Sequence, residues 1–421
     1  SMLPPATVLL APLLLAAALT GGQALAQAAA PAAAASAPTL RAETAKPLSA
    51  AQEAIKAGKY ADALARIAEA EALPGLTPYE QYIVLRLKGP ALFGSGDQPG
   101  ALAVFEKVVA SPLTPAAEKS SLAETTIKLA LQLKKYDSAQ VMMKAYLADR
   151  GSSPEIANLY PQVLSVQGDH AGVIAYLQPL LAADLAAKRV TPEATLRLLA
   201  ASQNQVKDSA GYLATLARLA GNTGKTDYWD ELINRTVRKD GFADERLRLD
   251  VYRLRQVVGI TLEADEIGDM AYRANQAGLP AEAQALLDVG FKSGLLGKGT
   301  NAAADQKLRE SATKAAAQDR ATLADSEAAA QKAANGNALV GLGMALSSTG
   351  AHERGLALIT QGIAKAGLRR ADDAQLHLGL VALRAGKADQ AKAAFAAVQG
   401  ADGAADLARL YLLHIDSPAR K

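Results

Sequence analysis

The sequence predicts an all-α protein, a solenoid of stacked antiparallel helix pairs. Alanine is very frequent, whereas aromatic residues make up only 4% of the 421 residues. Small, helix-favouring side chains suit tightly packed helices better than a β-sandwich. Glycines also recur at a regular spacing, for example 38 residues from Gly58 to Gly96 and 36 from Gly350 to Gly386. A sustained period of about 34–38 residues is typical of stacked helical hairpins.

Composition excludes several classes of function. Basic and acidic residues nearly cancel, 45 against 42, and no dense basic run is interleaved with aromatics, so nucleic-acid binding has little support. The chain contains no cysteine, which rules out disulfides, thiolate catalysis and cysteine-ligated metals. A lipid-modified N-terminal cysteine is ruled out for the same reason, so we do not expect a lipoprotein.

Residues 1–26 have the layout of a secretory signal peptide. An apolar stretch is followed by Ala24-Leu25-Ala26, which has the small-residue pattern of a cleavage site, although no Lys or Arg precedes the stretch. The alternative, an uncleaved membrane anchor, fits less well because the apolar run is short and rich in alanine. We therefore expect a soluble protein exported to the periplasm. Residues 27–46, rich in Ala and Pro, are predicted to be a flexible leader.

Residues 47–190 are predicted to hold the N-terminal helix pairs. Gly58 is followed by an aromatic residue two positions later and by an alanine five positions later. The glycine ends one helix, because it adopts the left-handed conformation without a Cβ penalty, and the alanine lets the next helix pack closely. Lys134 occupies the corresponding glycine position one period after Gly96. We expect the aromatic residues to fill gaps between units.

The pattern weakens in the middle of the chain. Residues 191–300 are predicted to be degenerate repeat units, because the 110 residues from Gly168 to Gly278 equal about three periods. The glycine-rich stretch at 290–300 is the expected internal boundary. Residues 301–335 are Ala-rich and polar, and we expect either a helical hairpin with a thin core or a mobile segment.

Residues 336–421 are predicted to return to regular units with a capping helix. The best-formed unit is 372–398, with Leu378-Gly379 followed by Gly386. The helix predicted at 402–415 has one apolar side, which either caps the last unit or docks a partner. The repeat positions along the whole chain are Gly58, Tyr60, Ala63, Gly96, Ala101, Gly278, Ala283, Gly350, Gly386, Ala391 and Phe395.

This pattern resembles the tetratricopeptide repeat (TPR) family over most of residues 47–415. The family's tryptophan is mostly missing, and Trp229 is the one place where it would survive. The resemblance implies a right-handed superhelix whose concave face is lined by the first helix of each pair and binds peptides or proteins. The groove residues that it implies are Arg86, Glu124, Lys128, Gln132, Asn158, Gln162, Tyr272, Asn275, Met344 and Arg384. The Lys/Asn/Arg pattern of the carboxylate-clamp subfamily is absent.

No motif points to catalysis. The stretch "GLLGKGT" resembles a phosphate-binding loop, but Gly299 follows Lys298 where that motif requires Ser or Thr. The "GLGMAL" stretch lacks the third glycine of a dinucleotide site, so helix packing explains it better. His352-Glu353 begins a zinc-protease motif, but Leu356 replaces its second histidine. We expect no catalytic residue, no metal and no cofactor.

The sequence therefore predicts an exported scaffold that binds a protein or peptide of a cell-envelope assembly, secretion or uptake system. One alternative is a helper of polysaccharide export or cell-wall metabolism that binds a glycan or a cell-wall enzyme. A second alternative is an enzyme whose site lies in the degenerate units at 222–335. Two or three carboxylates that meet in a closed pocket near 240–270 would favour the enzyme.

Overall fold

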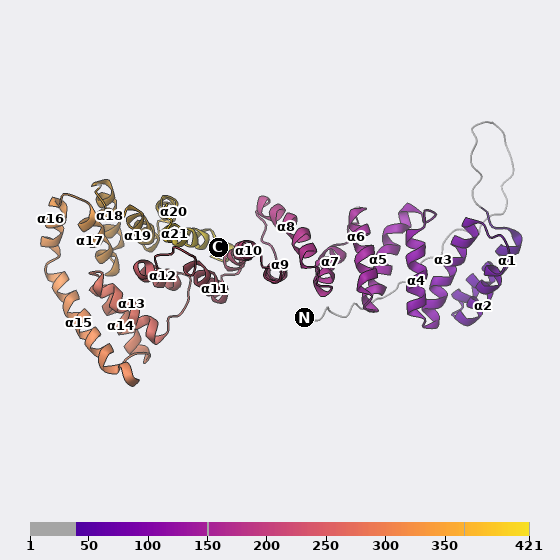
Figure 1. Ribbon diagram of the computed structural model, residues 1–421, viewed down its shortest axis with the longest axis horizontal. Coiled ribbons are helices and arrows are strands. Elements are labelled where there is room, and N and C mark those ends of the chain that lie inside the picture. Colours follow the sequence, from indigo (N-terminus) through magenta and orange to yellow (C-terminus); the bar gives the residue numbers. More distant parts are fainter. Residues whose placement is uncertain (1–38, 150, 366, 421) are drawn as a thin grey trace, which may run out of the picture. The chain divides into compact units, whose positions relative to one another are not determined.

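The computed structural model describes residues 39–149, 151–365 and 367–420 (Figure 1). Over these residues the chain forms 21 α-helices, two short 3-10 helices and no strand, so the all-α prediction is confirmed. The predicted signal peptide, residues 1–26, lies outside the described residues. None of the described helices combines the length and the apolar character needed to cross a membrane. The chain divides into two compact units, and the division falls between Leu177 and Gln178.

The first unit is a series of helix pairs. Each helix packs on its partner in the pair, and the second helix of each pair packs on the first helix of the next pair. The pairs are α1 (Ala42–Lys56) with α2 (Tyr60–Glu71), α3 (Pro78–Ser95) with α4 (Gln98–Ala110), and α5 (Ala116–Gln132) with α6 (Tyr136–Ala148). They are followed by α7 (Pro154–Val166) and α8 (His170–Ala186), which the division crosses. The rings of Tyr160 and Tyr176 meet edge to face, 5.0 Å apart, and hold α7 against the first part of α8.

The first helix begins inside the predicted leader. Since α1 starts at Ala42, the prediction of a flexible leader over 27–46 is wrong for its last residues, and Thr44 is fully buried. The side chain of Arg41 binds the buried carboxylate of Glu80 at 2.9 Å, and the Arg41 backbone N–H donates to the same carboxylate. Glu80 also forms a capping box with Thr77 at the start of α3. These bonds fix the start of α1 to the start of α3.

The turns between paired helices follow the predicted period. Gly96 adopts the left-handed conformation with φ 94°, and Lys134 adopts it with φ 56° although it is not glycine. Lys207 does the same with φ 61°, which places a turn 39 residues after Gly168 where the sequence pattern had faded. Gly241 follows 34 residues later with φ 81°. The repeat therefore continues through the degenerate region.

The alanines that were predicted to lie between paired helices are all buried. Ala63, Ala101, Ala283 and Ala391 have no exposed surface. The prediction that aromatic residues fill gaps between units holds for Tyr60, whose ring lies against Gly94 in the next pair. The Phe105 ring lies against Gly89 within its own pair. Phe395 also lies against its own pair, at Gly379, and in addition stacks on Tyr411 in the last helix.

The second unit contains the rest of α8 and all later helices. These are α9 (Glu193–Gln205), α10 (Ser209–Thr223), α11 (Thr226–Val237), α12 (Asp244–Val257), α13 (Ala264–Gln276), α14 (Pro280–Ser293), η1 (Gly299–Asn301), α15 (Ala302–Ala321), α16 (Leu323–Lys332), α17 (Asn337–Ser348), α18 (His352–Lys365), α19 (Ala371–Arg384), α20 (Ala388–Ala396), α21 (Ala404–Asp416) and η2 (Pro418–Arg420). The predicted boundary loop at 290–300 lies inside this unit.

The Ala-rich segment at 301–335 forms two helices, α15 and α16. They pack mainly on other helices, α15 on α14 and α16 on α17, rather than on each other. Only Ala312 and Ala316 of α15 and Ala330 of α16 are buried. The segment is thus helical, with a core that consists of alanine methyl groups.

The last helix joins the core of the second unit. Helix α21 packs on α20 and α19, and also on α10 and α12 near the start of the unit (Figure 1). Its Leu407 and Tyr411 are buried, and the His414 ring meets the buried Trp229 ring at 5.9 Å. The Ser417 hydroxyl donates to the carbonyl of Gly221. The apolar side of the predicted C-terminal helix is therefore covered by this chain's own helices.

Candidate functional site

The predicted groove residues of the first unit lie on α3, α5 and α7, the first helices of successive pairs. Arg86 on α3 binds Glu118 on α5 at 2.7 Å, and Lys128 on α5 binds Glu155 on α7 at 2.7 Å. Each of these ion pairs bridges two neighbouring first helices. These charged groups therefore already form ion pairs within the unit itself.

Other predicted groove residues are also engaged within the first unit. Glu124 accepts a hydrogen bond from the Tyr146 hydroxyl at 2.6 Å. The Gln132 amide lies 3.5 Å from the side-chain oxygen of Gln98. Gln162 donates to the backbone carbonyl of Asn158, whose own side chain is exposed. Much of the hydrogen-bonding capacity of these polar side chains is therefore used within the fold.

Four predicted groove residues lie in the second unit and do not form a set. Tyr272 on α13 is 53% exposed and Asn275 is half-buried. Met344 on α17 is buried in the core, so its prediction as a surface residue is wrong. Met344 belongs to the main apolar core of the second unit. Arg384 lies at the end of α19 beside a buried group of charges.

An apolar groove in the first unit was not predicted. It lies between the end of α4, the start of α5 and one face of α6, and has a volume of about 740 Å³. Val141 lines it and, at 69%, is the most exposed large apolar side chain in the described part of the chain. The half-buried Met142 lies beside it. The rest of the lining is Glu106, Val109, Ala110, Ala116, Lys119, Ser120, Ala123, Asp137, Ser138, Ala145, Tyr146, Asp149 and Gly151.

Side chains and backbone are closely packed at one end of this groove. The buried Tyr146 ring lies against Gly151, where an added Cβ would come within 2.2 Å of the ring. The Tyr146 hydroxyl accepts from the backbone N–H of Ser153 and donates to Glu124. These contacts tie the end of α6 to α5 and to the start of α7. The stretch "QVMMKAYL" could have indicated this groove, because its apolar residues cover more of the helix surface than one buried face requires.

A group of buried charges lies in the core of the second unit. Arg253 on α12 is 2% exposed and binds both carboxylate oxygens of Glu282 on α14, at 3.0 and 2.6 Å. It also binds Asp250 at 2.8 Å. On the other side, His377 of α19 lies 3.1 Å from Asp250, and Arg384 lies 3.6 Å from Glu282. We call these five residues the buried charge network.

The electrostatics of the network favour ionised groups. Burial alone would raise the pKa of Asp250, but His377 and Arg253 outweigh it and hold the pKa well below its usual range. Burial is likewise outweighed for Glu282, whose pKa is lowered by Arg253 and Arg384. The neighbouring carboxylates raise the pKa of Arg253 against the effect of burial. Burial raises the pKa of the Tyr411 hydroxyl, which has no hydrogen-bond partner among the described residues.

This arrangement bears on the enzyme alternative. Two carboxylates, Asp250 and Glu282, do meet near residues 240–270, yet both are bound to the same guanidinium. A general acid needs a raised pKa, and a general base is weakened by a strongly lowered one. The pattern is that of an ion network that joins helices. Over the described residues, no three His, Asp or Glu side chains cluster so as to hold a metal ion.

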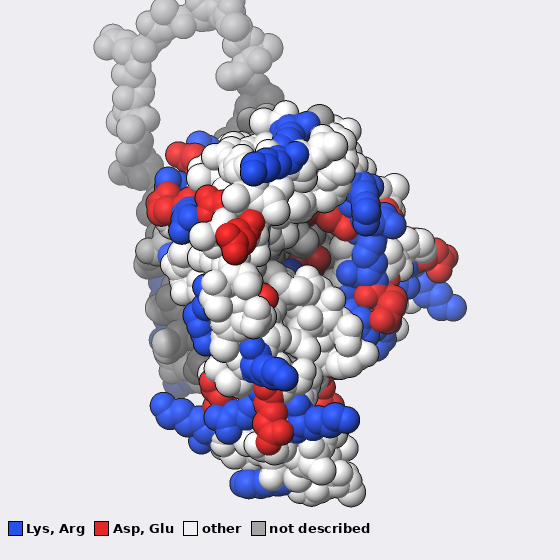
Figure 2. Space-filling model, turned by 90° about the vertical axis from the view of Figure 1, so that its left-hand side faces the viewer, with Lys and Arg blue, Asp and Glu red and all other residues white. Residues whose placement is uncertain are grey.

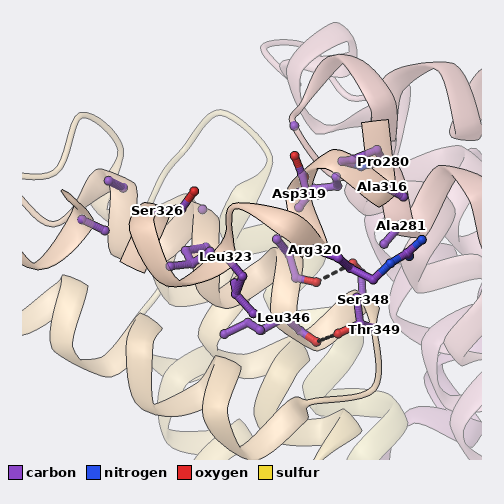
Figure 3. Close-up of a pocket in the computed structure, with 17 residues that line it drawn as sticks. Pro280, Ala281, Ala316, Asp319, Arg320, Leu323, Ser326, Leu346, Ser348 and Thr349 are labelled. Carbon is purple, nitrogen blue, oxygen red and sulfur yellow. Dashed lines mark hydrogen bonds between the residues drawn. The ribbon is translucent and has the colours of Figure 1, made fainter. Parts of the chain in front are cut away.

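Further hollows lie in the second unit. One, of about 360 Å³, is lined by residues of α14, α15, α16 and α17, mostly alanine, glycine and leucine, with Asp319 and Arg320 at its side (Figure 3). Another, of about 730 Å³, is lined by residues of α14 and by the loops after α12 and α17, and Glu282 and Arg384 reach its wall. In the face shown in Figure 2, basic and acidic side chains are interspersed.

Comparisons with known proteins give no family. No family model matches the chain, and no curated protein matches it. The chain is similar to a solved structure titled as Naa15/Naa10 bound to HypK-THB, with 13% identity over 87% of this chain and a TM-score of 0.26. It spans 58% of the length of that chain.

Two other solved structures show a similar level of likeness. The crystal structure of the P58(IPK) TPR domain has 13% identity over 88% of this chain and 99% of that chain, with a TM-score of 0.22. The APC/C hetero-tetramer Cut9-Hcn1 has 10% identity over 87% and 83%, with a TM-score of 0.17. Because these TM-scores are low, the assignment of the fold rests on the helix pairs described above.

Proposed function

We propose that this protein is a non-catalytic scaffold that binds a protein or peptide partner, and that the apolar groove of the first unit is its binding site. The exposure of Val141 is the observation that carries the proposal. A contiguous apolar surface on a folded protein marks an interaction site more often than an isolated exposed residue does. Here Val141, Met142 and Ala145 share one helix face, and Val109 and Ala110 face them from α4.

The location of the partner follows from the N-terminal sequence. Residues 1–26 have the layout of a secretory signal. We therefore propose that the scaffold acts in the periplasm, within an assembly, secretion or uptake system of the cell envelope. This part of the proposal rests on the sequence pattern alone.

A site-specific crosslink tests the proposal. A photo-reactive amino acid would replace Val141 in the full chain, expressed in cells that make the protein. In a matched chain it would replace Val289, which is 64% exposed on α14 of the second unit. We expect one dominant protein to crosslink from position 141 and not from position 289, and to be lost when Met142→Asp is added. Equal products from both positions, or none from 141, would overturn the proposal.

A further inference from the structure

We propose that the partner presents a basic amphipathic α-helix to the apolar groove of the first unit. This inference rests on the proposed function and specifies the part of the partner that binds. It follows from the length of the groove, from the chemistry of its floor and from the charges around it.

The groove has the dimensions of a short helix. Its lining residues along α6 run from Asp137 to Tyr146 and continue to Asp149, the residue that follows the helix. At 1.5 Å per residue this span is about 18 Å long, which matches about 12 residues of a straight partner helix. Side chains of α4 and α5 form the opposite wall, so the partner helix would lie alongside α6 as a further helix packed on the unit.

The floor favours a helix over an extended peptide. Its central side chains are Val109, Val141, Met142 and Ala145, which donate no hydrogen bond and offer no acceptor stronger than the thioether sulfur of methionine. An extended peptide laid on them would bury backbone N–H and C=O groups without partners. A helix satisfies its own backbone and presents only apolar side chains to the floor. Met142 adds an adaptable side chain that fits ligands of different shape.

The charges favour a basic helix. Among the described residues that line the groove, three are acidic, Glu106, Asp137 and Asp149, and one, Lys119, is basic. Glu106 and Asp137 accept hydrogen bonds from Ser138 and from Gln167, which leave their negative charge in place. None of these four charged residues forms an ion pair within the described part of the chain. Lysine or arginine on the flanks of a bound helix would complement this excess of negative charge.

Two labelled peptides of about 12 residues test the inference, since that length matches the groove. Both carry leucine at i, i+3, i+4 and i+7 spacing, and the other positions are lysine in one peptide and glutamate in the other. Fluorescence anisotropy would measure their binding to the full chain. We expect the lysine peptide to bind at least about tenfold more tightly, with a preference that shrinks as salt is added.

Variants decide whether the groove is responsible. Val141→Asp is expected to abolish binding of the lysine peptide, whereas the matched Val289→Asp leaves it unchanged. Val141 is mostly exposed, so its replacement leaves the fold intact, which circular dichroism would check. The double variant Asp137→Lys/Asp149→Lys reverses the charge of the groove and should transfer the preference to the glutamate peptide.

The outcomes separate this inference from the proposed function. Equal binding of both peptides, no binding of either, or binding of the lysine peptide that survives Val141→Asp would overturn the basic helix. If the crosslink from position 141 still captures one protein in that case, the scaffold stands and its partner binds through another element. If the crosslink also fails, both proposals fail.

Discussion

The two units differ in how deeply they bury basic side chains that form ion pairs. In the first unit, the basic side chains of Arg86–Glu118 and Lys128–Glu155 are 19% and 31% exposed, and Arg41, which binds the buried Glu80, is 40% exposed. In the second unit, Arg253 is enclosed, and its partners lie on α12 and α14, with α19 completing the network. Exposed ion pairs contribute little to the stability of a protein, whereas breaking a buried ion pair lowers its stability strongly. The first unit therefore depends on local helix pairs, and the second on contacts between segments far apart in the sequence.

The largest effect is expected from Arg253→Met, which leaves Asp250 and Glu282 buried without their shared partner. The free energy of unfolding of the second unit should fall by about 3–5 kcal/mol. Trp229, the single tryptophan of the sequence, is buried in this unit, so its fluorescence during urea denaturation reports the loss.

An exposed ion pair of the same unit provides the control. Arg354 binds Glu327 with its own side chain 55% exposed, so Arg354→Met should change the free energy of unfolding by at most about 1 kcal/mol. If Arg253→Met were no more destabilising than Arg354→Met, the buried charge network would not distinguish the second unit.

Acid should weaken the second unit through the same network. The pKa values of Asp250 and Glu282 are lowered in the folded state, so each carboxyl binds a proton more readily when unfolded. Their stabilisation is complete above the usual carboxyl pKa of about 4 and is lost as the pH falls through the lower folded values. Urea denaturation followed by Trp229 at a series of pH values should show this decline, and Asp250→Asn should make it shallower. Equal slopes for the two proteins would contradict the assignment.

Two glycines of α17 test the close packing of α17 on α18. A Cβ at Gly343 would lie 2.6 Å from the backbone oxygen of Gly355, so Gly343→Ala should cost about 1–3 kcal/mol. Gly341 is exposed and has no atom near its Cβ position, so Gly341→Ala should stabilise the helix by about 0.5–1 kcal/mol. Thermal unfolding of both variants checks the predicted opposite signs, and a shared sign would show that α17 and α18 are less closely packed.

The smallest effect is expected at a turn. Lys207 holds a positive φ of 61°, which costs an ordinary side chain about 1–2 kcal/mol, so Lys207→Gly should recover part of that, up to about 1 kcal/mol. Lys207→Ala keeps the strain and should leave the midpoint of urea denaturation unchanged. A gain with alanine would mean that loss of the lysine charge, and not the backbone, is responsible.

The repeat architecture could be predicted because each pair follows local rules. The positions of Gly58, Gly96 and Ala391 encode turns and close contacts within a few residues of themselves. The repeat unit near residue 205, whose glycine pattern is weak, also carries a local sequence pattern that marks the start of a helix. Asp97, Asp169 and Asp208 each cap a helix by accepting from the backbone N–H of a glycine three residues later, in the sequence pattern Asp-x-x-Gly.

Long-range features could not be predicted in the same way. The apolar side of α21 showed that it would be covered, but not that α10 and α12 would cover it. Asp250 and His377 are 127 residues apart, and no local pattern pairs them. The groove at Val141 depends on the spacing between α4 and α6, which packing sets. The polar groove residues that the resemblance implied were placed on their helices, but their partners within the fold were not foreseen.

The packing of α21 on α10 and α12 has a consequence for the order of events during synthesis. Each hairpin of the first unit can form as soon as its two helices have emerged, because its contacts are local. The second unit has to wait until residues 404–416 are made, since Leu407 and Tyr411 complete the core around α10 and α12. Until then its buried face, including Trp229, stays open to solvent. A ribosome that stalls before residue 404 therefore leaves one half of the protein finished and the other half dependent on chaperones or exposed to proteases.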